Sequence, residues 1–270
     1  MNFDGKTIAI TGGASGIGAA MARAFAEQGA HIVIGDLRVE PAQTLADEIG
    51  GAAVRCDVTR ENDIQELVST AETHFGPIDI FVSNAGVAMG EPAHAASASD
   101  EVWHLCWQVH VMAHVYAARA VLPAMIARRS GALVQIASAA GLLNQIGDAA
   151  YSATKHAAVS FAESLAITHV DDGVSVSVAC PQYLATPLIG LKDQDAERHP
   201  SLIRADQVAK AVLEGVSRGA FLILPHPEVS DYLQLKSNDY DKWVAGMRRL
   251  RARAILDTGS CLPKDMYKLV

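Results

Sequence analysis

Short apolar runs alternate with longer amphipathic stretches along most of the chain. The apolar runs have the length of strands and cover residues 6–10, 31–35, 52–56, 78–82, 132–137, 174–179 and 221–224. The stretches between them have the length of helices and cover residues 19–28, 41–49, 60–75, 100–129, 149–170 and 205–218. Strands that are apolar throughout and alternate with helices are typical of a parallel sheet that is buried on both faces. We therefore predict an α/β fold, a doubly wound parallel sheet of about seven strands with helices on both faces.

Three glycines separate the first predicted strand from the first predicted helix. Residues 11–18 read TGGASGIG, so that Gly12, Gly16 and Gly18 follow the spacing G-x-x-x-G-x-G. Glycine lets the backbone turn sharply and approach a ligand closely because it has no Cβ atom. The free N–H groups of the following helical turn point toward an anion. The stretch therefore predicts a pyrophosphate site, the alternative being a glycine-rich turn that binds nothing.

An acidic residue ends the second predicted strand. Asp36 follows the apolar run 31–35 and lies about 20 residues beyond Gly18, where dinucleotide-binding folds carry the acid that bonds the ribose hydroxyls. Its charge would repel a 2′-phosphate, so Asp36 favours NAD over NADP. Arg38, two residues further on, weakens that preference, and the alternative for Asp36 is a solvated loop carboxylate.

Polar residues and glycines also end the other predicted strands. The carboxyl ends of parallel strands meet at one edge of the sheet, and ligands bind outside that edge. We therefore expect one site to collect the residues that follow the strands, which are Gly12, Asp36, Asp57, Asn84, Ser138 and Pro181.

A tyrosine and a lysine stand four residues apart in the helix predicted over 149–170. Tyr151 and Lys155 therefore share one helix face. A nearby lysine favours the phenolate and lowers the pKa of tyrosine, and such a tyrosine can take a proton from an alcohol as a general base. Ser138, at the end of the adjacent strand, can hydrogen-bond the substrate oxygen from a second direction. Alone, a Y-x-x-x-K pair is usually a solvated helix face.

Together these motifs resemble the short-chain dehydrogenase/reductase family in its one-domain, NAD-dependent type. The resemblance extends from about residue 4 to 225, and the matching residues are Thr11, Gly12, Gly16, Ile17, Gly18, Asp57, Val58, Asn84, Ala85, Gly86, Ser138, Tyr151, Lys155, Pro181 and Thr186. It implies a Rossmann-like fold and metal-free oxidation of alcohols or reduction of carbonyls. We therefore predict an oxidoreductase that interconverts a secondary alcohol and its ketone by hydride transfer. The alternatives are a dinucleotide-binding protein with altered catalysis, or an epimerase or dehydratase on the same scaffold.

The resemblance also assigns roles to residues. It implies that Asp57 and Val58 contact adenine, that Lys155 holds the nicotinamide ribose, and that Thr186 holds the carboxamide. Ser15 stands where NADP-using members often carry a basic residue, which again favours NAD. The predicted cofactor-binding residues are Gly12, Ser15, Gly16, Ile17, Gly18, Asp36, Leu37, Asp57, Val58, Asn84, Ala85, Gly86, Tyr151, Lys155, Pro181 and Thr186. The predicted substrate-binding residues are Ser138, Gln182, Tyr183 and Leu143.

The chain departs from the family pattern at two positions. The family carries an asparagine seven residues after a tryptophan in the long helix, and counting from Trp103 reaches His110. We predict that His110 joins Tyr151 and Lys155 in passing the proton to solvent; the alternative is that it fills the helix and bonds a backbone group. Where the family has a Pro-Gly pair, the chain has Pro181 followed by Gln182, whose side chain can narrow the pocket or bond the substrate.

Composition narrows the classes of partner. The net charge is −8 without a basic stripe, which argues against nucleic acid. No apolar run approaches the ~20 residues that cross a bilayer, and the first residues lack the pattern of a signal peptide. The four cysteines form no C-x-x-C pair, and no carboxylate motif accompanies the pair His110 and His114, so we expect neither a disulfide framework nor a metal. We predict a cytoplasmic protein whose partner is a small alcohol or ketone.

No linker divides the 270 residues, so we predict one domain over 1–270 with its core at about 4–225 and a C-terminal extension at 226–270. Trp243, Met247 and Leu250 lie at helical spacing in that extension and are expected to cover the pocket or contact a neighbouring subunit, the alternative being packing on their own subunit. Pro123 is expected to kink or divide the helix predicted over 100–129. The resemblance implies a homo-oligomer, a tetramer or dimer. The substrate is expected to be apolar or cyclic because apolar residues approach the site, namely Val87, Met89, Leu142, Leu143, Leu188, Ile189, Leu191 and Leu202.

Overall fold

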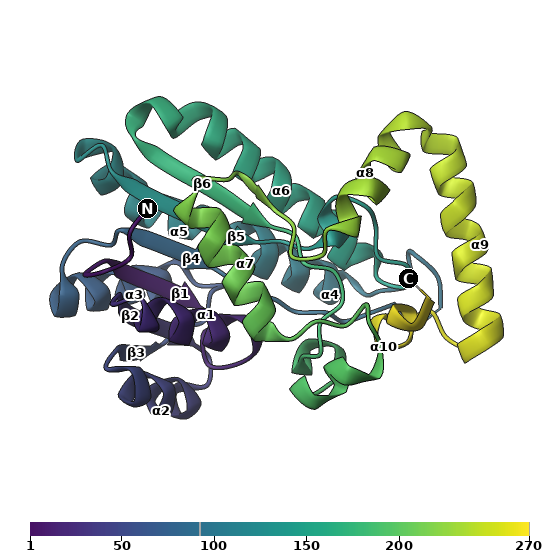
Figure 1. Ribbon diagram of the computed structural model, residues 1–270, viewed down its shortest axis with the longest axis horizontal. Coiled ribbons are helices and arrows are strands. Elements are labelled where there is room, and N and C mark those ends of the chain that lie inside the picture. Colours follow the sequence, from purple (N-terminus) through teal and green to yellow (C-terminus); the bar gives the residue numbers. More distant parts are fainter. Residues whose placement is uncertain (92, 270) are drawn as a thin grey trace.

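One parallel sheet of seven strands organises the computed structural model, which describes residues 1–91 and 93–269 (Figure 1). Its strands are β1 (Thr7–Thr11), β2 (His31–Asp36), β3 (Ala52–Arg55), β4 (Ile80–Ser83), β5 (Gly131–Ile136), β6 (Val174–Ala179) and β7 (Leu222–Ile223). They lie in the order β3-β2-β1-β4-β5-β6-β7, so the order reverses between β1 and β4. Ligands bind at such a switch point in doubly wound sheets. The predicted fold class is confirmed, and each strand lies within two residues of its predicted range at either end.

Helices cover both faces of the sheet. One face carries α1 (Gly16–Glu27), α2 (Val39–Ile49) and α7 (Ala205–Ser217); the other carries α3 (Glu61–Phe75), α5 (Ala113–Ala127) and α6 (Ala149–His169). Side chains alternate between the faces, as the two-residue period of a strand requires. In β1, Ile8 and Ile10 pack against Met21 of α1, whereas Ala9 faces the second core. Burial on both faces is the reason that the strands are apolar throughout.

The long helix predicted over 100–129 is irregular at a different place from the one expected. It consists of α4 (Asp100–Trp107), a π-helical turn at Gln108–Met112, and α5. The helix continues through Pro123, so the predicted division at that residue is wrong. Proline removes one intrahelical hydrogen bond, and burial of the neighbouring Val121 and Met125 keeps this part of α5 against the sheet. The irregular turn instead contains His110.

The same helical stretch, Asp100–Ala127, is long and apolar enough to cross a membrane by length and composition alone. Half of its most apolar window is buried inside the protein. Core helices of globular folds meet the same criteria, so the stretch is not evidence for a membrane span.

The C-terminal extension forms α8 (Glu228–Asn238), α9 (Tyr240–Thr258) and α10 (Pro263–Met266). Figure 1 shows α8 and α9 as a helical hairpin at the right edge of the view, with α10 below them. Trp243 packs against Leu143, while Met247 and Leu250 join a small core with Ile146 and Tyr183. The extension therefore packs on the loop at residues 143–146 and on Tyr183, while contact with a neighbouring subunit stays a prediction.

Short 3-10 turns complete the connections at Ala139–Gly141, Val170–Asp172, Pro187–Ile189, Asp193–Arg198 and Tyr267–Leu269.

Candidate active site

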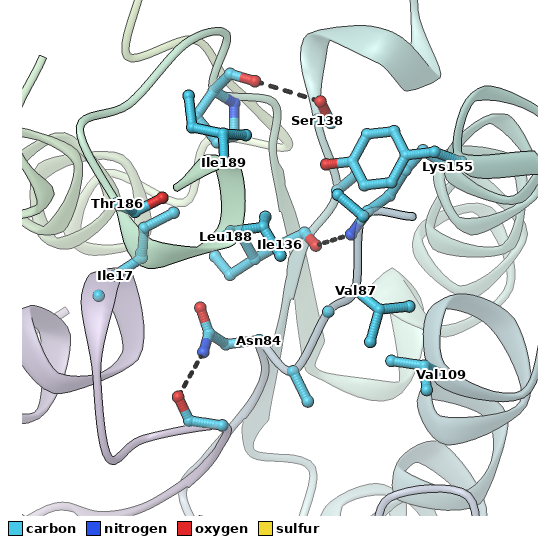
Figure 2. A pocket seen from close by; sticks show the side chains of 18 of the residues that line it. Ile17, Asn84, Val87, Val109, Ile136, Ser138, Lys155, Thr186, Leu188 and Ile189 are labelled. Carbon is cyan, nitrogen blue, oxygen red and sulfur yellow. Dashed lines mark hydrogen bonds between the residues drawn. The ribbon is translucent and has the colours of Figure 1, made fainter. Parts of the chain in front are cut away.

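A cavity of about 650 Å³ lies at the carboxyl ends of the strands. It brings together all of the predicted site residues except Gly18 and His110, which lie behind its wall. Figure 2 shows how side chains from widely separated parts of the sequence converge there, among them Ile17, Asn84, Ser138, Lys155 and Thr186. The expectation of a single site at the sheet edge therefore matches the geometry.

The glycine turn after β1 is held by the loop that follows β4. The side-chain nitrogen of Asn84 donates to the carbonyl oxygens of Thr11 (2.9 Å) and Gly12 (3.0 Å). A Cβ atom on Gly18 would lie 2.3 Å from the Gly12 oxygen and 2.6 Å from the Asn84 nitrogen. Gly18 is therefore needed so that α1 can begin directly beneath the turn, and it has no contact with the cavity.

The beginning of α1 faces the cavity through Ser15, Gly16 and Ile17. Gly16 has a φ of +53°, a conformation that favours glycine. A Cβ atom added to Gly16 would lie 3.8 Å from the Thr186 side chain. The first N–H groups of a helix lack intrahelical partners and attract anions. A turn without Cβ atoms beside a helix N-terminus fits the pyrophosphate of a dinucleotide, and Thr186 lies directly beside this turn.

The far end of the cavity is acidic. Both oxygens of Asp36 accept backbone hydrogen bonds, one from Ala14 N–H (3.0 Å) and one from Arg38 N–H (2.9 Å), so the carboxylate is held at the end of β2. The Arg38 guanidinium lies 3.6 Å from Asp36 and donates to the Ser15 hydroxyl at 2.7 Å. Asp57 and Val58 line the same end. The cavity thus offers a fixed carboxylate for ribose hydroxyls, with one cation beside it.

Three predicted catalytic residues lie at the opposite end. Lys155 donates to the Ile136 carbonyl at 3.0 Å, and its nitrogen lies 5.6 Å from the centre of the Tyr151 ring. The Ser138 hydroxyl donates to the Pro181 carbonyl at 3.4 Å and accepts the Ala140 N–H at 3.1 Å. Figure 2 shows Ser138 and Lys155 on one side of the cavity, facing Thr186 and Ile17. A phenol, a hydroxyl and an ammonium group therefore border one space at the ends of β5 and α6.

Burial sets the proton affinities of this group. It raises the pKa of Tyr151 to about 12, with the Ser138 hydrogen bond acting in the lowering direction, and it lowers the pKa of Lys155 to about 8. The expected lowering of the tyrosine pKa by Lys155 is therefore not found in the chain by itself. The reason is that removing both groups from water disfavours the phenolate and the ammonium alike. A bound oxidised nicotinamide ring, which the resemblance implies, would place a positive charge near the phenol and lower the pKa of Tyr151.

His110 lies in the π-helical turn and is fully buried. Its Nε2 accepts the Val87 N–H at 3.1 Å, and its Nδ1 lies 2.8 Å from the Thr154 hydroxyl. Because Nε2 accepts, Nδ1 carries the hydrogen and donates it to Thr154, and the ring is neutral. Burial, together with the positive charge of Lys155, holds the pKa of His110 well below its ordinary value. These contacts favour the alternative in which His110 bonds the backbone and positions the loop at Val87 next to the catalytic residues.

Asp148 is a site residue that the sequence analysis missed. It is buried and accepts three backbone hydrogen bonds, from Tyr151 N–H (3.1 Å), Gly90 N–H (2.8 Å) and Met89 N–H (3.2 Å). It caps the N-terminus of α6 and connects the start of that helix to the loop after β4. An aspartate directly before a predicted helix is a capping signal, so this position could have been identified from sequence.

The C-terminal extension supports the end of the cavity that lies away from Asp36, called the substrate end below and lined by Leu143, Gln182 and Tyr183. His226 accepts the Gln182 N–H and donates to the Tyr183 carbonyl, each at 3.1 Å. Lys236 donates to the carbonyls of Leu142 (2.7 Å) and Leu143 (2.9 Å). No local pattern marks these two residues, because their partners lie about 40 and about 90 residues away along the chain.

Replacing His110 separates a positioning role from a proton relay. We expect His110→Ala to lower the free energy of unfolding by about 2–4 kcal/mol, because it leaves a cavity and an unbonded Val87 N–H. His110→Asn keeps a polar group that can accept that bond, so most of the activity and stability should remain. Since the imidazole stays neutral, the pH–rate profiles of the parent and the asparagine variant should coincide from pH 6 to 9. Loss of a titration near neutral pH in the asparagine variant alone would assign the relay to His110.

Known proteins share this architecture and much of this sequence. A family model described as short chain dehydrogenase matches residues 6–197. The chain is 32% identical to the oxidoreductase UcpA of Salmonella typhimurium over 97% of both chains. It is 34% identical to a cis-4-hydroxycyclohexanecarboxylate dehydrogenase of Sinomonas cyclohexanicum, over 78% of this chain and 88% of that one.

Among solved structures, a short chain dehydrogenase/reductase from Burkholderia phymatum in complex with NAD is similar, with a TM-score of 0.80. The two chains are 28% identical, and the match covers 89% of this chain and 96% of that chain. Because the family model covers well over half of the chain, and relatives align with it over nearly their whole length, the protein belongs to the short-chain dehydrogenase/reductase family.

Proposed function

We propose that this oxidoreductase uses NAD to interconvert a secondary alcohol and its ketone, and that its substrate is apolar or cyclic. The observation that carries the proposal is the convergence of Ser138, Tyr151 and Lys155 on one cavity that also contains the glycine turn. A dinucleotide held at the turn and at Asp36 would extend toward these three residues.

The proposed reaction assigns one task to each residue. The glycine turn and Asp36 would hold NAD, which would supply a hydride acceptor for the alcohol carbon. Tyr151 takes the hydroxyl proton as the general base, and in the reverse direction it returns that proton to the carbonyl oxygen. Ser138 donates a hydrogen bond to the same oxygen and holds it beside the phenol. Lys155 stabilises the phenolate by its charge and is itself oriented by the Ile136 carbonyl.

The walls at the substrate end support an apolar substrate. Leu143, Val109 and Leu188 line the cavity near the catalytic residues, and the polar contacts of Gln182 and Tyr183 backbone groups are already made with His226. The relative from Sinomonas is named for a ring alcohol that also carries a carboxylate. An apolar pocket with few polar groups suits such a ring.

A protein that binds a dinucleotide without catalysis is less consistent with this site, because the phenol, hydroxyl and ammonium groups remain together. An epimerase or dehydratase would need the hydride to return to the substrate. The alcohol assay below separates these possibilities, since only a dehydrogenase releases NADH.

We expect cyclic and aryl secondary alcohols to be oxidised faster than short polyols or short hydroxy acids, measured by NADH absorbance. Tyr151→Phe should lower kcat by ~10²–10⁴-fold, because proton transfer is lost, while NADH affinity measured by fluorescence is retained. A variant that keeps more than about a hundredth of the rate would contradict general-base catalysis by Tyr151. Faster turnover of polyols would contradict the apolar substrate.

The preference for NAD depends on the charge balance between Asp36 and Arg38. We expect kcat/KM to be higher with NAD than with NADP, because the fixed carboxylate of Asp36 repels a 2′-phosphate. Asp36→Ala should reduce that ratio by at least about tenfold. Arg38→Ala, which removes the adjacent cation, should increase it. Equal or better use of NADP by the parent would mean that Arg38 dominates.

We also propose that the chain forms a homo-oligomer, a tetramer or dimer. Large apolar side chains are exposed on neighbouring helices, with Ile167 and Val170 of the α6 region 81% and 63% exposed, and Leu105 and Trp107 of α4 also exposed. Large apolar side chains left exposed to water favour contact between subunits. Sedimentation equilibrium at micromolar concentration should give at least twice the chain mass of 28.5 kDa. A single-chain mass under those conditions would refute this assembly.

A further inference from the structure

A second cavity adjoins the first at its substrate end. It has a volume of about 390 Å³ and lies between the loop at residues 143–146, the segment at 182–183 and the C-terminal extension. Leu143, Gln182 and Tyr183 line both cavities, as does Asn144. The two cavities therefore share a wall made by these four residues, at the end of the larger cavity that lies away from Asp36.

The inner wall of this second cavity is apolar. Trp243, Met247 and Leu250 of α9 line it from one side, and Ile146 and Met266 line it from the others. The three α9 residues recur at helical spacing, so they form one face of that helix. A volume of this size, added to the larger cavity, is enough for several more carbon atoms of a ligand.

Two cations stand at the rim of the same cavity. Lys242 and Arg249 lie two helical turns apart on α9, line the cavity, and are solvent-exposed. A Cβ atom on Gly246 would lie 3.7 Å from a guanidinium nitrogen of Arg249, so this side chain folds back along the helix toward Lys242. Among the residues that the structure describes, no aspartate or glutamate lines the cavity. In a protein with a net charge of −8, this rim carries a local positive charge, which attracts anions.

From these features we propose that the second cavity binds the far end of the substrate, and that the substrate is an apolar alcohol or ketone with a carboxylate remote from the oxidised carbon. The hydrocarbon part would lie against Trp243 and Met247. The carboxylate would stay at the hydrated rim between Lys242 and Arg249, where it need not be stripped of water. This inference rests on the proposed alcohol chemistry at Tyr151 and adds the substrate class.

The wall between the two cavities is fixed by the same extension that supplies the cations. Lys236 of α8 bonds the carbonyls of Leu142 and Leu143, and Trp243 of α9 packs against Leu143. Lys236 and Trp243 therefore connect the helices that carry Lys242 and Arg249 to the loop at Leu142 and Leu143. A ligand that spans both cavities would have its two ends held by parts of the chain that are packed together.

A homologous series of alcohols tests the proposal. We would compare secondary alcohols that end in a methyl group with the same alcohols ending in a carboxylate, over chains of six to twelve carbons. The parent should prefer the carboxylates at one chain length through a lower KM. Arg249→Gln should reduce the ratio of kcat/KM for acid over neutral alcohol by about fivefold, as expected for an exposed charge pair. Raising the salt concentration should also reduce the ratio of kcat/KM for acid over neutral alcohol in the parent, because salt screens the charges. Arg248→Gln, which removes the adjacent charge outside the cavity, is the matched control.

A binding measurement separates this inference from the proposed function. The affinity of decanoate and of its methyl ester is measured by calorimetry on the protein with NADH, so that no turnover is needed. The proposal requires tighter binding of decanoate, and loss of that difference in Arg249→Gln but not in Arg248→Gln. Equal binding of acid and ester, or equal effects of the two arginine variants, overturns it even if the neutral alcohols are oxidised. Failure to oxidise any alcohol, with decanoate still preferred, would instead count against the proposed reaction alone.

Discussion

The structure depends on a close approach between two backbone segments at the centre of the sheet. The turn after β1 and the loop after β4 leave no room for a Cβ atom at Gly12, which would lie 2.8 Å from the Ala85 Cα, or at Gly18. Thr11 and Asn84 connect the same two segments by hydrogen bonds, so the beginning of α1 is held at the switch point of the sheet. The helix N-terminus, the acid at the end of β2 and the catalytic residues beyond β5 all have fixed positions relative to that contact.

The catalytic residues are placed by polar contacts that are themselves buried. Lys155 is held by a strand carbonyl, the helix that carries it is capped by Asp148, and His110 bonds the loop at Val87. Each contact satisfies a polar group that would otherwise be costly to bury. Burial also raises the pKa of Tyr151 and lowers that of Lys155. The phenol therefore resists ionisation, and the neighbouring lysine loses its proton more readily than a lysine in water. A bound positive ring would ease the first effect.

Much of this arrangement could be predicted because it is local in sequence. Strand ends, the glycine spacing and the interval between Tyr151 and Lys155 are periodic or adjacent features, and the residues they mark line one cavity, except Gly18. The π-helical turn around His110 was not predicted. Pro123 is a strong local signal for a helix irregularity, whereas no residue pattern at 108–112 marks a π-helical turn. The contacts of His226 and Lys236 join positions far apart in the chain, and no local pattern encodes such pairs.

The hydrogen bonds from Lys236 to the Leu142 and Leu143 carbonyls connect the C-terminal extension to the cavity, which affects how the selectivity of such enzymes can change. The nucleotide end of the cavity is built entirely from the sheet and its flanking turns, whereas the opposite end is shaped by α8 and α9. Since the described part of the extension, residues 226–269, contributes no strand to the sheet, its sequence can change with little effect on the glycine turn after β1 or on Tyr151. Selectivity can therefore be retuned over generations by a peripheral helical hairpin while the chemical machinery is inherited intact.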